Sequence, residues 1–219
     1  MVTNENIDKV IKILKNEIIK YKEPIVGVIA RTTKDPFRVL VSTMISLRTK
    51  DDITTEASKR LFILADSPAE MIKLTDRAIE KAIYPAGFYR VKAKAIKKTS
   101  KMLLESYAGK VPNTLDELLG LSGVGRKTAN LVLTLGFNKY GICVDTHVHR
   151  ITNRWGYVET KHPEETESVL RGKLPKKHWK TINDLLVTYG QNLCHPVSPV
   201  CSKCRLYAYC GKCGVRARR

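Results

Sequence analysis

The chain has 219 residues, of which 43% are hydrophobic and 27% charged, a composition that does not indicate disorder and suffices for one large domain or two small lobes. Its 39 Lys and Arg residues against 21 Asp and Glu give a formal net charge of +18, which favours a polyanionic partner, nucleic acid first and an anionic membrane surface second. No apolar run approaches the roughly 20 residues of a spanning helix, and the N-terminus is charged rather than signal-like, so we expect a soluble, cytoplasmic protein without membrane insertion.

Consecutive short helices are predicted along the chain. Apolar residues recur at helical spacing from residue 7 to residue 18, which predicts an amphipathic helix near 4–21 that ends before Pro24. Pro36 begins a second predicted helix, and Asp51 or Asp52 caps a third. Further helical patterns cover the ranges 68–83, 90–106, 114–119, 125–137, 145–155, 163–171 and 178–190. Since no alternating strand series is present, the sequence predicts an all-α fold.

Two glycines mark a hairpin between two of these helices. Thr114 and Glu117 have the spacing of a capping box, which predicts a short helix before the turn. The run Gly123-Val124-Gly125 then leads into the next helix, with Arg126 and Lys127 just inside it. Because helix N-termini leave N–H groups unpaired, glycines that permit close approach make a seat for a phosphate there. The local sequence equally fits a tight interhelix turn with an exposed lysine.

Lys127 is a candidate amine nucleophile beside bound DNA, with Asp145 following it in the chain. An uncharged lysine at this position could attack a sugar carbon. The stretch from Gly120 through Lys127 and Thr128 also nearly matches the phosphate-binding loop of nucleotide triphosphatases. However, Arg126 breaks the Gly-Lys adjacency that this loop requires, and no hydrophobic strand precedes it, so we expect no nucleotide cofactor.

Five cysteines lie near the C-terminus and fit metal ligation better than disulfides, since nothing indicates an oxidising compartment. Cys194, Cys201, Cys204 and Cys210 have the spacing C-x6-C-x2-C-x5-C, which suits an iron–sulfur cluster and leaves Cys213 spare. The same stretch without Cys194 but with Cys213 reads C-x2-C-x5-C-x2-C, a plausible spacing for tetrahedral zinc. The spacing leaves both alternatives open, and either metal would be structural.

The hairpin with Lys127, the run Val144-Asp145-Thr146-His147-Val148 and the four-cysteine spacing together resemble the endonuclease III family, bifunctional DNA glycosylases of the helix-hairpin-helix superfamily. The resemblance extends over nearly the whole chain. It implies a two-lobed, all-α fold with a six-helix barrel lobe at 29–139, whose helix-hairpin-helix motif occupies about 114–137. The second lobe, 1–28 plus 140–219, would hold a four-iron, four-sulfur (4Fe-4S) cluster on the loop 194–210.

The same resemblance implies base excision repair as the function. The expected activities are removal of damaged, oxidised pyrimidines from duplex DNA, followed by abasic-site lyase chemistry through a Lys127 Schiff base and β-elimination. Lys127 and Asp145 match the family's nucleophile and catalytic aspartate, and the family's cluster favours Cys194, Cys201, Cys204 and Cys210 as ligands. The alternatives are a monofunctional glycosylase for thymine or uracil opposite guanine, and a non-catalytic DNA-binding module. The expected partner is damaged double-stranded DNA, bound by a monomer.

Two loops and the hairpin are expected to contact DNA. Bacterial family members have a glutamine where Arg48 aligns, in the loop that fills the vacated duplex, so the opposite-base preference is open. Phe88 aligns with a second inserted loop, where it could wedge a base step, a core phenylalanine being the alternative. The residues expected to contact DNA are Leu47, Arg48, Phe88, Gly123, Val124, Gly125 and Arg126.

Overall fold

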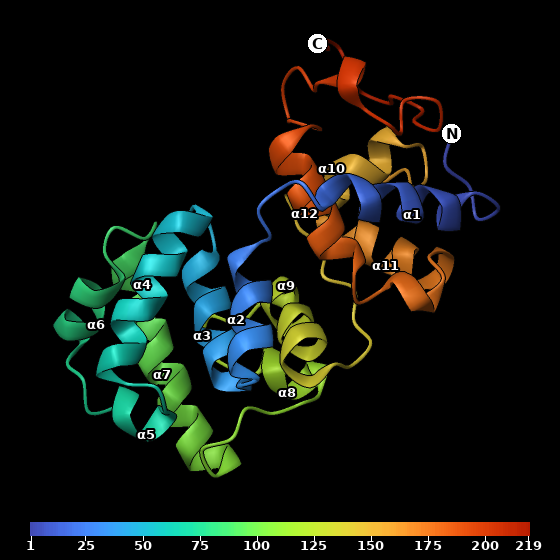
Figure 1. Ribbon diagram of the computed structural model, residues 1–219. Coiled ribbons are helices and arrows are strands. Elements are labelled where there is room, and N and C mark those ends of the chain that lie inside the picture. The colour runs from blue at the N-terminus through green and yellow to red at the C-terminus, as the bar shows by residue number, and fades with distance from the viewer. The chain divides into compact units, whose positions relative to one another are not determined.

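The computed structural model describes residues 1–219, and every regular element in it is helical, which confirms the all-α prediction. The chain divides into two compact units, one of residues 1–24 plus 142–219 and one of residues 25–141 (Figure 1). The boundaries that the resemblance implies fall after residues 28 and 139, whereas this division falls after residues 24 and 141. None of the helices combines the length and the hydrophobicity that spanning a bilayer would require.

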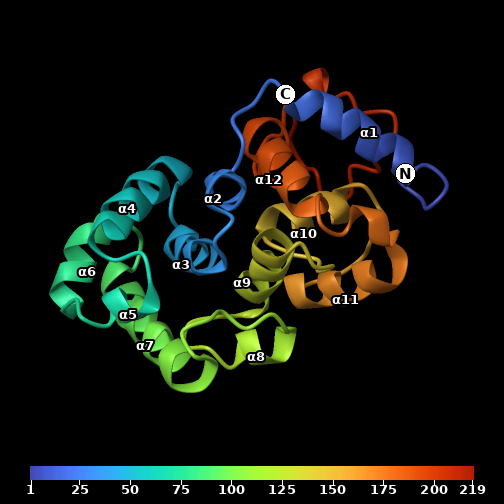
Figure 2. The same cartoon turned by 60° about the horizontal axis from the view of Figure 1, so that its bottom comes forward.

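The unit 25–141 is built around α3, which is buried along most of its length and packs against α2, α4, α7, α9 and η1 (Figure 2). Helix α3 begins at Pro36, as predicted, and its N-cap Asp35 accepts a hydrogen bond of 2.8 Å from the Phe37 amide. The helices of this unit are α2 (Ile25–Thr33), α3 (Pro36–Ser46), α4 (Asp51–Leu64), α5 (Pro68–Met71), α6 (Asp76–Ile83), α7 (Tyr89–Tyr107), α8 (Leu115–Leu119), α9 (Arg126–Leu131) and the π-helix η1 (Val132–Gly136).

The unit 1–24 plus 142–219 joins the two ends of the chain. Its N-terminal helix packs against α12 and contributes an apolar stripe to a core that includes Trp155, Tyr157 and Tyr189. The Tyr157 hydroxyl donates to Asn4 Oδ1 at 2.7 Å, which fixes the N-terminal segment in place. The elements of this unit are α1 (Ile7–Ile18), α10 (Thr146–Arg154), α11 (Pro163–Lys173), η2 (Lys176–His178), α12 (Ile182–Asn192) and η3 (Cys201–Lys203).

Two predicted elements differ from the observed ones, and one observed helix was not predicted. The pattern at 68–83 forms two helices: α5 ends at Met71, and Thr75 caps a new helix, α6, by accepting from the Ala78 amide. Neither Asp51 nor Asp52 caps α4; Lys50 occupies that position without a side-chain hydrogen bond, and both aspartates lie in the first turn, where they complement the helix dipole. Helix α2 was not among the predicted elements, since its Val- and Ile-rich sequence carries no cap signal.

Candidate active site

The predicted hairpin is present between α8 and α9 and is anchored to α7. Thr114 caps α8 by accepting from the Glu117 amide at 3.4 Å, while its hydroxyl donates to the Glu117 carboxylate at 2.5 Å. At the turn, the Ser122 carbonyl accepts from the Thr99 hydroxyl of α7 at 2.6 Å. Gly123 has φ +74°, and a Cβ there would lie 2.9 Å from the Ala95 Cβ. The turn therefore requires glycine both for its conformation and for its close approach to α7.

The hairpin presents backbone and basic groups to the surface. Gly123, Gly125 and Arg126 are exposed, whereas Val124 is 6% exposed and packs inward. Val124 can therefore contribute only its backbone to a ligand. Lys127 is half-buried and is the second residue of α9, as predicted. Helix α9 continues directly into η1, and the two together cover most of the predicted helix at 125–137.

Asp145 lies in the other unit, at the N-terminus of α10. Its Oδ1 atom accepts from the backbone amides of His147 and Val148, both at 2.9 Å, so Asp145 is the N-cap of this helix. The carboxylate is half-buried and follows a fully buried segment, Ile142–Val144, which holds the cap in place. A capping role leaves Asp145 compatible with a second, chemical role.

The two loops predicted to enter DNA lie side by side in the unit 25–141. Arg48 is exposed with φ +52°, and its guanidinium carbon lies 5.6 Å from the centroid of the Phe88 ring. Phe88 is 62% exposed and has φ +57°, which excludes the core position that its sequence left open. Leu47, at the C-terminus of α3, is half-buried. A cation and an aromatic ring in contact on an exposed loop pair make a surface suited to stacking on bases.

Lys92 joins these loops and is a residue that the sequence reasoning missed. It is 8% exposed, and its ammonium donates to the carbonyls of Ile45 and Leu47 and to the hydroxyl of Thr49. Burial lowers its pKa from the ordinary 10.5 to about 8. The signal that could have found it is its register, since Lys92 lies four residues before the buried Ile96 on the apolar stripe of α7.

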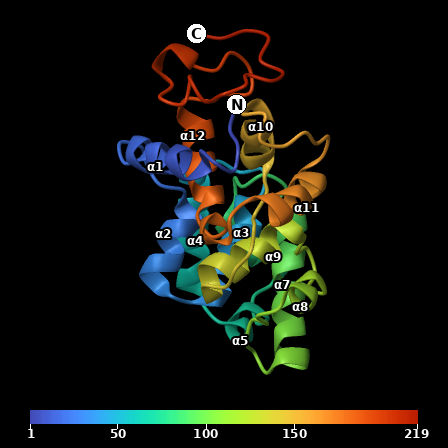
Figure 3. The ribbon, with the colours of Figure 1, turned by 90° about the vertical axis from the view of Figure 1, so that its right-hand side faces the viewer.

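Four thiols converge on one cavity in the unit that contains both termini. Cys194, Cys201, Cys204 and Cys210 all line this cavity, together with side chains of α10 and α12, while Cys213 is exposed and does not line it. The segment that carries them is a run of loops after α12, coloured red in Figure 3. No group of three or more His, Cys, Asp or Glu side chains is gathered closely enough to hold a single ion. The shared cavity groups the four cysteines of the first predicted ligand set without Cys213.

Polar groups of α10 and α12 contact these thiols. The guanidinium of Arg154 donates to Cys194 Sγ at 3.3 Å and to the carbonyls of His195 and Pro196, which orders the start of the loop. The Tyr189 hydroxyl lies 2.9 Å from Cys204 Sγ. Burial raises the pKa values of the Cys204 and Cys210 thiols, so the apoprotein holds them protonated. A bound metal would reverse this, because thiolates are the ligating form.

Comparison with known proteins assigns this architecture. A family model described as HhH-GPD superfamily base excision DNA repair protein matches residues 41–176. Endonuclease III of Thermotoga maritima is 49% identical over 176 residues, which cover 80% of this chain and 83% of the relative. The solved structure of a trapped endonuclease III–DNA covalent intermediate matches with a TM-score of 0.86 at 31% identity, covering 97% of both chains. A thermostable thymine-DNA glycosylase matches in fold alone, with a TM-score of 0.79 at 22% identity over 94% of this chain and 98% of its own.

Proposed function

The chain belongs to the endonuclease III family of HhH-GPD base excision repair glycosylases, and from this premise we propose that it removes damaged pyrimidines from duplex DNA and then cleaves the abasic strand. The observation that carries the proposal is Lys127, half-buried as the second residue of α9 behind an exposed glycine hairpin. The similarity to an endonuclease III trapped covalently on DNA supports an amine nucleophile at this position. Oxidised pyrimidines are the proposed lesion class.

The proposed reaction begins when the damaged nucleotide leaves the base stack, which costs least for a damaged or mispaired base. The uncharged amine of Lys127 attacks the anomeric carbon, so that a nitrogen–carbon bond forms as the glycosidic bond to the base breaks. The carboxylate of Asp145 stabilises the positive charge that develops on the sugar. The amine nitrogen then loses a proton as the bond between the anomeric carbon and the ring oxygen breaks; the ring oxygen takes up a proton and a Schiff base remains. Removal of a C2′ proton starts β-elimination, which expels the 3′ phosphate and cleaves the strand.

We propose further that Cys194, Cys201, Cys204 and Cys210 bind a 4Fe-4S cluster. Four thiolates, one to each iron, are the usual ligand set of such a cluster. Tetrahedral zinc would instead gather four sulfurs around a single ion at about 2.3 Å from each, and the set that its spacing requires includes Cys213, which does not line the cavity. When bound, the cluster supplies structural cross-linking, since four protein ligands leave no open position for substrate.

Borohydride reduction tests the nucleophile, because it traps a Schiff base as a covalent protein–DNA complex. Wild-type protein should become cross-linked to duplex DNA that carries an oxidised pyrimidine. Lys127→Gln should keep its affinity for this DNA and lose the cross-link. The control is Lys98→Gln, which removes an exposed lysine of α7 in the same unit and should trap like wild type. Undiminished trapping by Lys127→Gln would exclude Lys127, and base release without any wild-type trapping would indicate a monofunctional glycosylase.

A further inference from the structure

Lys92 differs from every other lysine of α7. The helix carries lysines at 92, 94, 97, 98 and 101, and of these Lys92 alone is buried. Lysine side chains are almost never fully buried unless the ammonium is paired. No carboxylate accepts a hydrogen bond from Lys92; its partners are two backbone carbonyls and one hydroxyl. An ammonium that is buried and bonded to backbone carbonyls therefore has a structural or positioning role that a surface lysine does not have.

The contacts of Lys92 use all of its hydrogen-bonding capacity. An ammonium has three N–H donors, and those of Lys92 reach Ile45 O at 2.6 Å, Leu47 O at 2.5 Å and Thr49 Oγ1 at 2.8 Å. Ile45 and Leu47 lie at the C-terminus of α3, where the last carbonyls of a helix lack intrahelical partners and carry partial negative charge. Lys92 therefore caps the C-terminus of α3 and fixes the direction in which the chain enters the first loop, the one that carries Arg48.

Thr49 extends this contact to the second loop, the one that carries Gly87 and Phe88. Its Oγ1 accepts from Lys92 and also from the Gly87 amide at 3.1 Å, so one hydroxyl joins α7, the first loop and the second. The two loops meet so closely that a Cβ on Gly87 would lie 2.5 Å from the Arg48 carbonyl oxygen. Arg48 and Phe88 then project from adjacent backbone segments with their side chains in contact.

We propose that Lys92 is a positioning residue whose ammonium, directly and through Thr49, holds both loops in the arrangement in which Arg48 and Phe88 fill the gap left by the extruded nucleotide. This inference rests on the proposed function. Ordering a loop on binding costs free energy, so two loops that are already fixed in the free protein bind DNA more tightly. A small displacement of groups that hold substrate can also cost a large factor in rate. Lys92 would thus act on base release without touching the reacting atoms.

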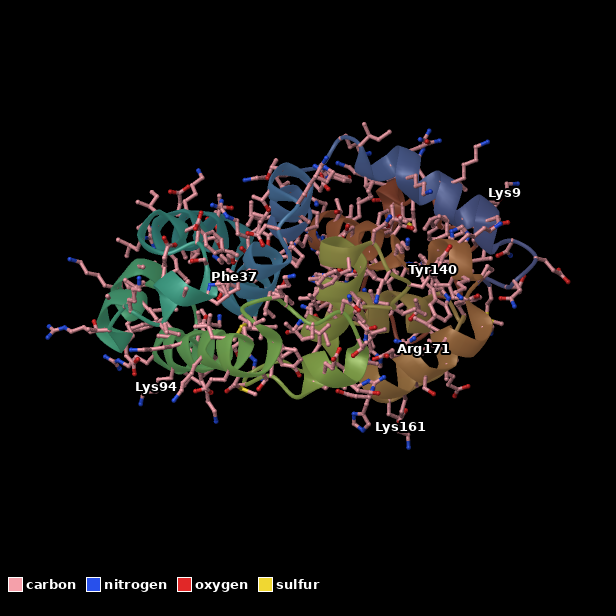
Figure 4. All side chains as sticks on the ribbon, turned by 90° about the horizontal axis from the view of Figure 1, so that it is seen from below. Lys9, Phe37, Lys94, Tyr140, Lys161 and Arg171 are labelled. Carbon is pink, nitrogen blue, oxygen red and sulfur yellow. The ribbon has the colours of Figure 1, made fainter.

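The test substitution is Lys92→Met, which keeps the chain length and the apolar stem but removes the ammonium. Its matched control is Lys94→Met, since a residue two positions along a helix points about 200° away and Lys94 projects outward (Figure 4). Gap filling is read from 2-aminopurine fluorescence, with the fluorescent base opposite a non-cleavable abasic analogue in duplex DNA. Base release is measured in single turnover on duplex DNA with one oxidised pyrimidine.

We expect Lys92→Met to lose most of the fluorescence change and to release the base about tenfold more slowly or worse, whereas Lys94→Met behaves like wild type. Borohydride trapping on an abasic site in single-stranded DNA offers no gap to fill, so Lys92→Met should retain it. Thr49→Val removes the shared hydroxyl but leaves the lysine, and should reduce the fluorescence change even if Lys92→Met fails to fold.

Three results are decisive. Unchanged fluorescence and duplex base release in a folded Lys92→Met protein would overturn the inference. So would an equal loss of trapping on single-stranded DNA, because that would indicate general damage to the unit rather than mispositioned loops. If wild-type protein shows gap filling that Lys92→Met loses, but never traps a Schiff base, the proposed lyase chemistry fails while the role of Lys92 is supported.

Discussion

At the scale of single residues, Asp145 combines a capping contact with a proposed catalytic charge, and two substitutions separate them. Asn caps helices as well as Asp, whereas Ala costs about 1 kcal/mol at an N-cap. Asp145→Asn should therefore keep the hydrogen bonds to His147 and Val148 and the unfolding free energy. Because it removes the carboxylate charge, its single-turnover base release should fall by about 100-fold or more. Asp145→Ala should lose both the stability that the cap contributes and the rate of base release.

Urea unfolding followed by circular dichroism, alongside base release on one lesion duplex, measures this pair. If Asp145→Asn released the base at the wild-type rate, Asp145 would be a cap and nothing more. If both variants lost stability equally, the cap would depend on the charge rather than on the oxygen atom.

At the scale of elements, Lys92 makes α7 pH-sensitive. Its pKa of about 8 results from burial alone, and the ordinary value in an unfolded chain is 10.5. Between these values the unfolded chain binds more protons, so the free energy of unfolding should rise with pH. Integrated between about pH 7.5 and pH 9.5, the gain is on the order of 2 kcal/mol. Subtracting the profile of Lys92→Met, measured by urea denaturation, removes every other titration. A flat difference profile would contradict the prediction.

The elements also show which structural features could be predicted from the sequence. The hairpin was predictable because its signals are local, namely a capping residue and glycines at a turn. The cysteine spacings predicted that Cys194, Cys201, Cys204 and Cys210 act together, and these four line one cavity. Helix α2 was missed because branched residues and Gly27 resemble no strong helical pattern. The contact between Arg48 and Phe88 arises from tertiary packing across 40 residues of chain, and Lys92 was hidden among four exposed or half-buried lysines. Contacts between residues this far apart in the chain follow no fixed sequence spacing, so a single sequence does not predict them.

At the scale of the whole molecule, the C-terminal segment lacks the core that would order it without a cross-link. Beyond Cys194, only Pro199 and Leu206 are buried, and the one regular element is the three-residue η3. Single hydrogen bonds tie it to the region of α10: the Arg154 guanidinium donates to the His195 carbonyl, and the Gly211 and Cys213 amides donate to the Trp155 and Arg154 carbonyls. Segments with so little buried apolar surface are ordered by metals or disulfides. The proposed cluster would therefore determine whether residues 194–219 are folded.

Substituting the two cysteines whose positions distinguish the alternatives tests this dependence. Cys194→Ser should lose bound iron and sulfide and expose the segment 194–219 to limited proteolysis, because Cys194 lines the cavity. Cys213→Ser should keep both the metal content and protease resistance, since Cys213 is exposed and outside the lining. The zinc alternative predicts the reverse for both variants, with one zinc and no sulfide per chain. Elemental analysis of the purified protein and its two variants, read together with the cleavage pattern, discriminates between the two ligand sets, and the unit 25–141 should resist protease in all three proteins because its core contains no ligand cysteine.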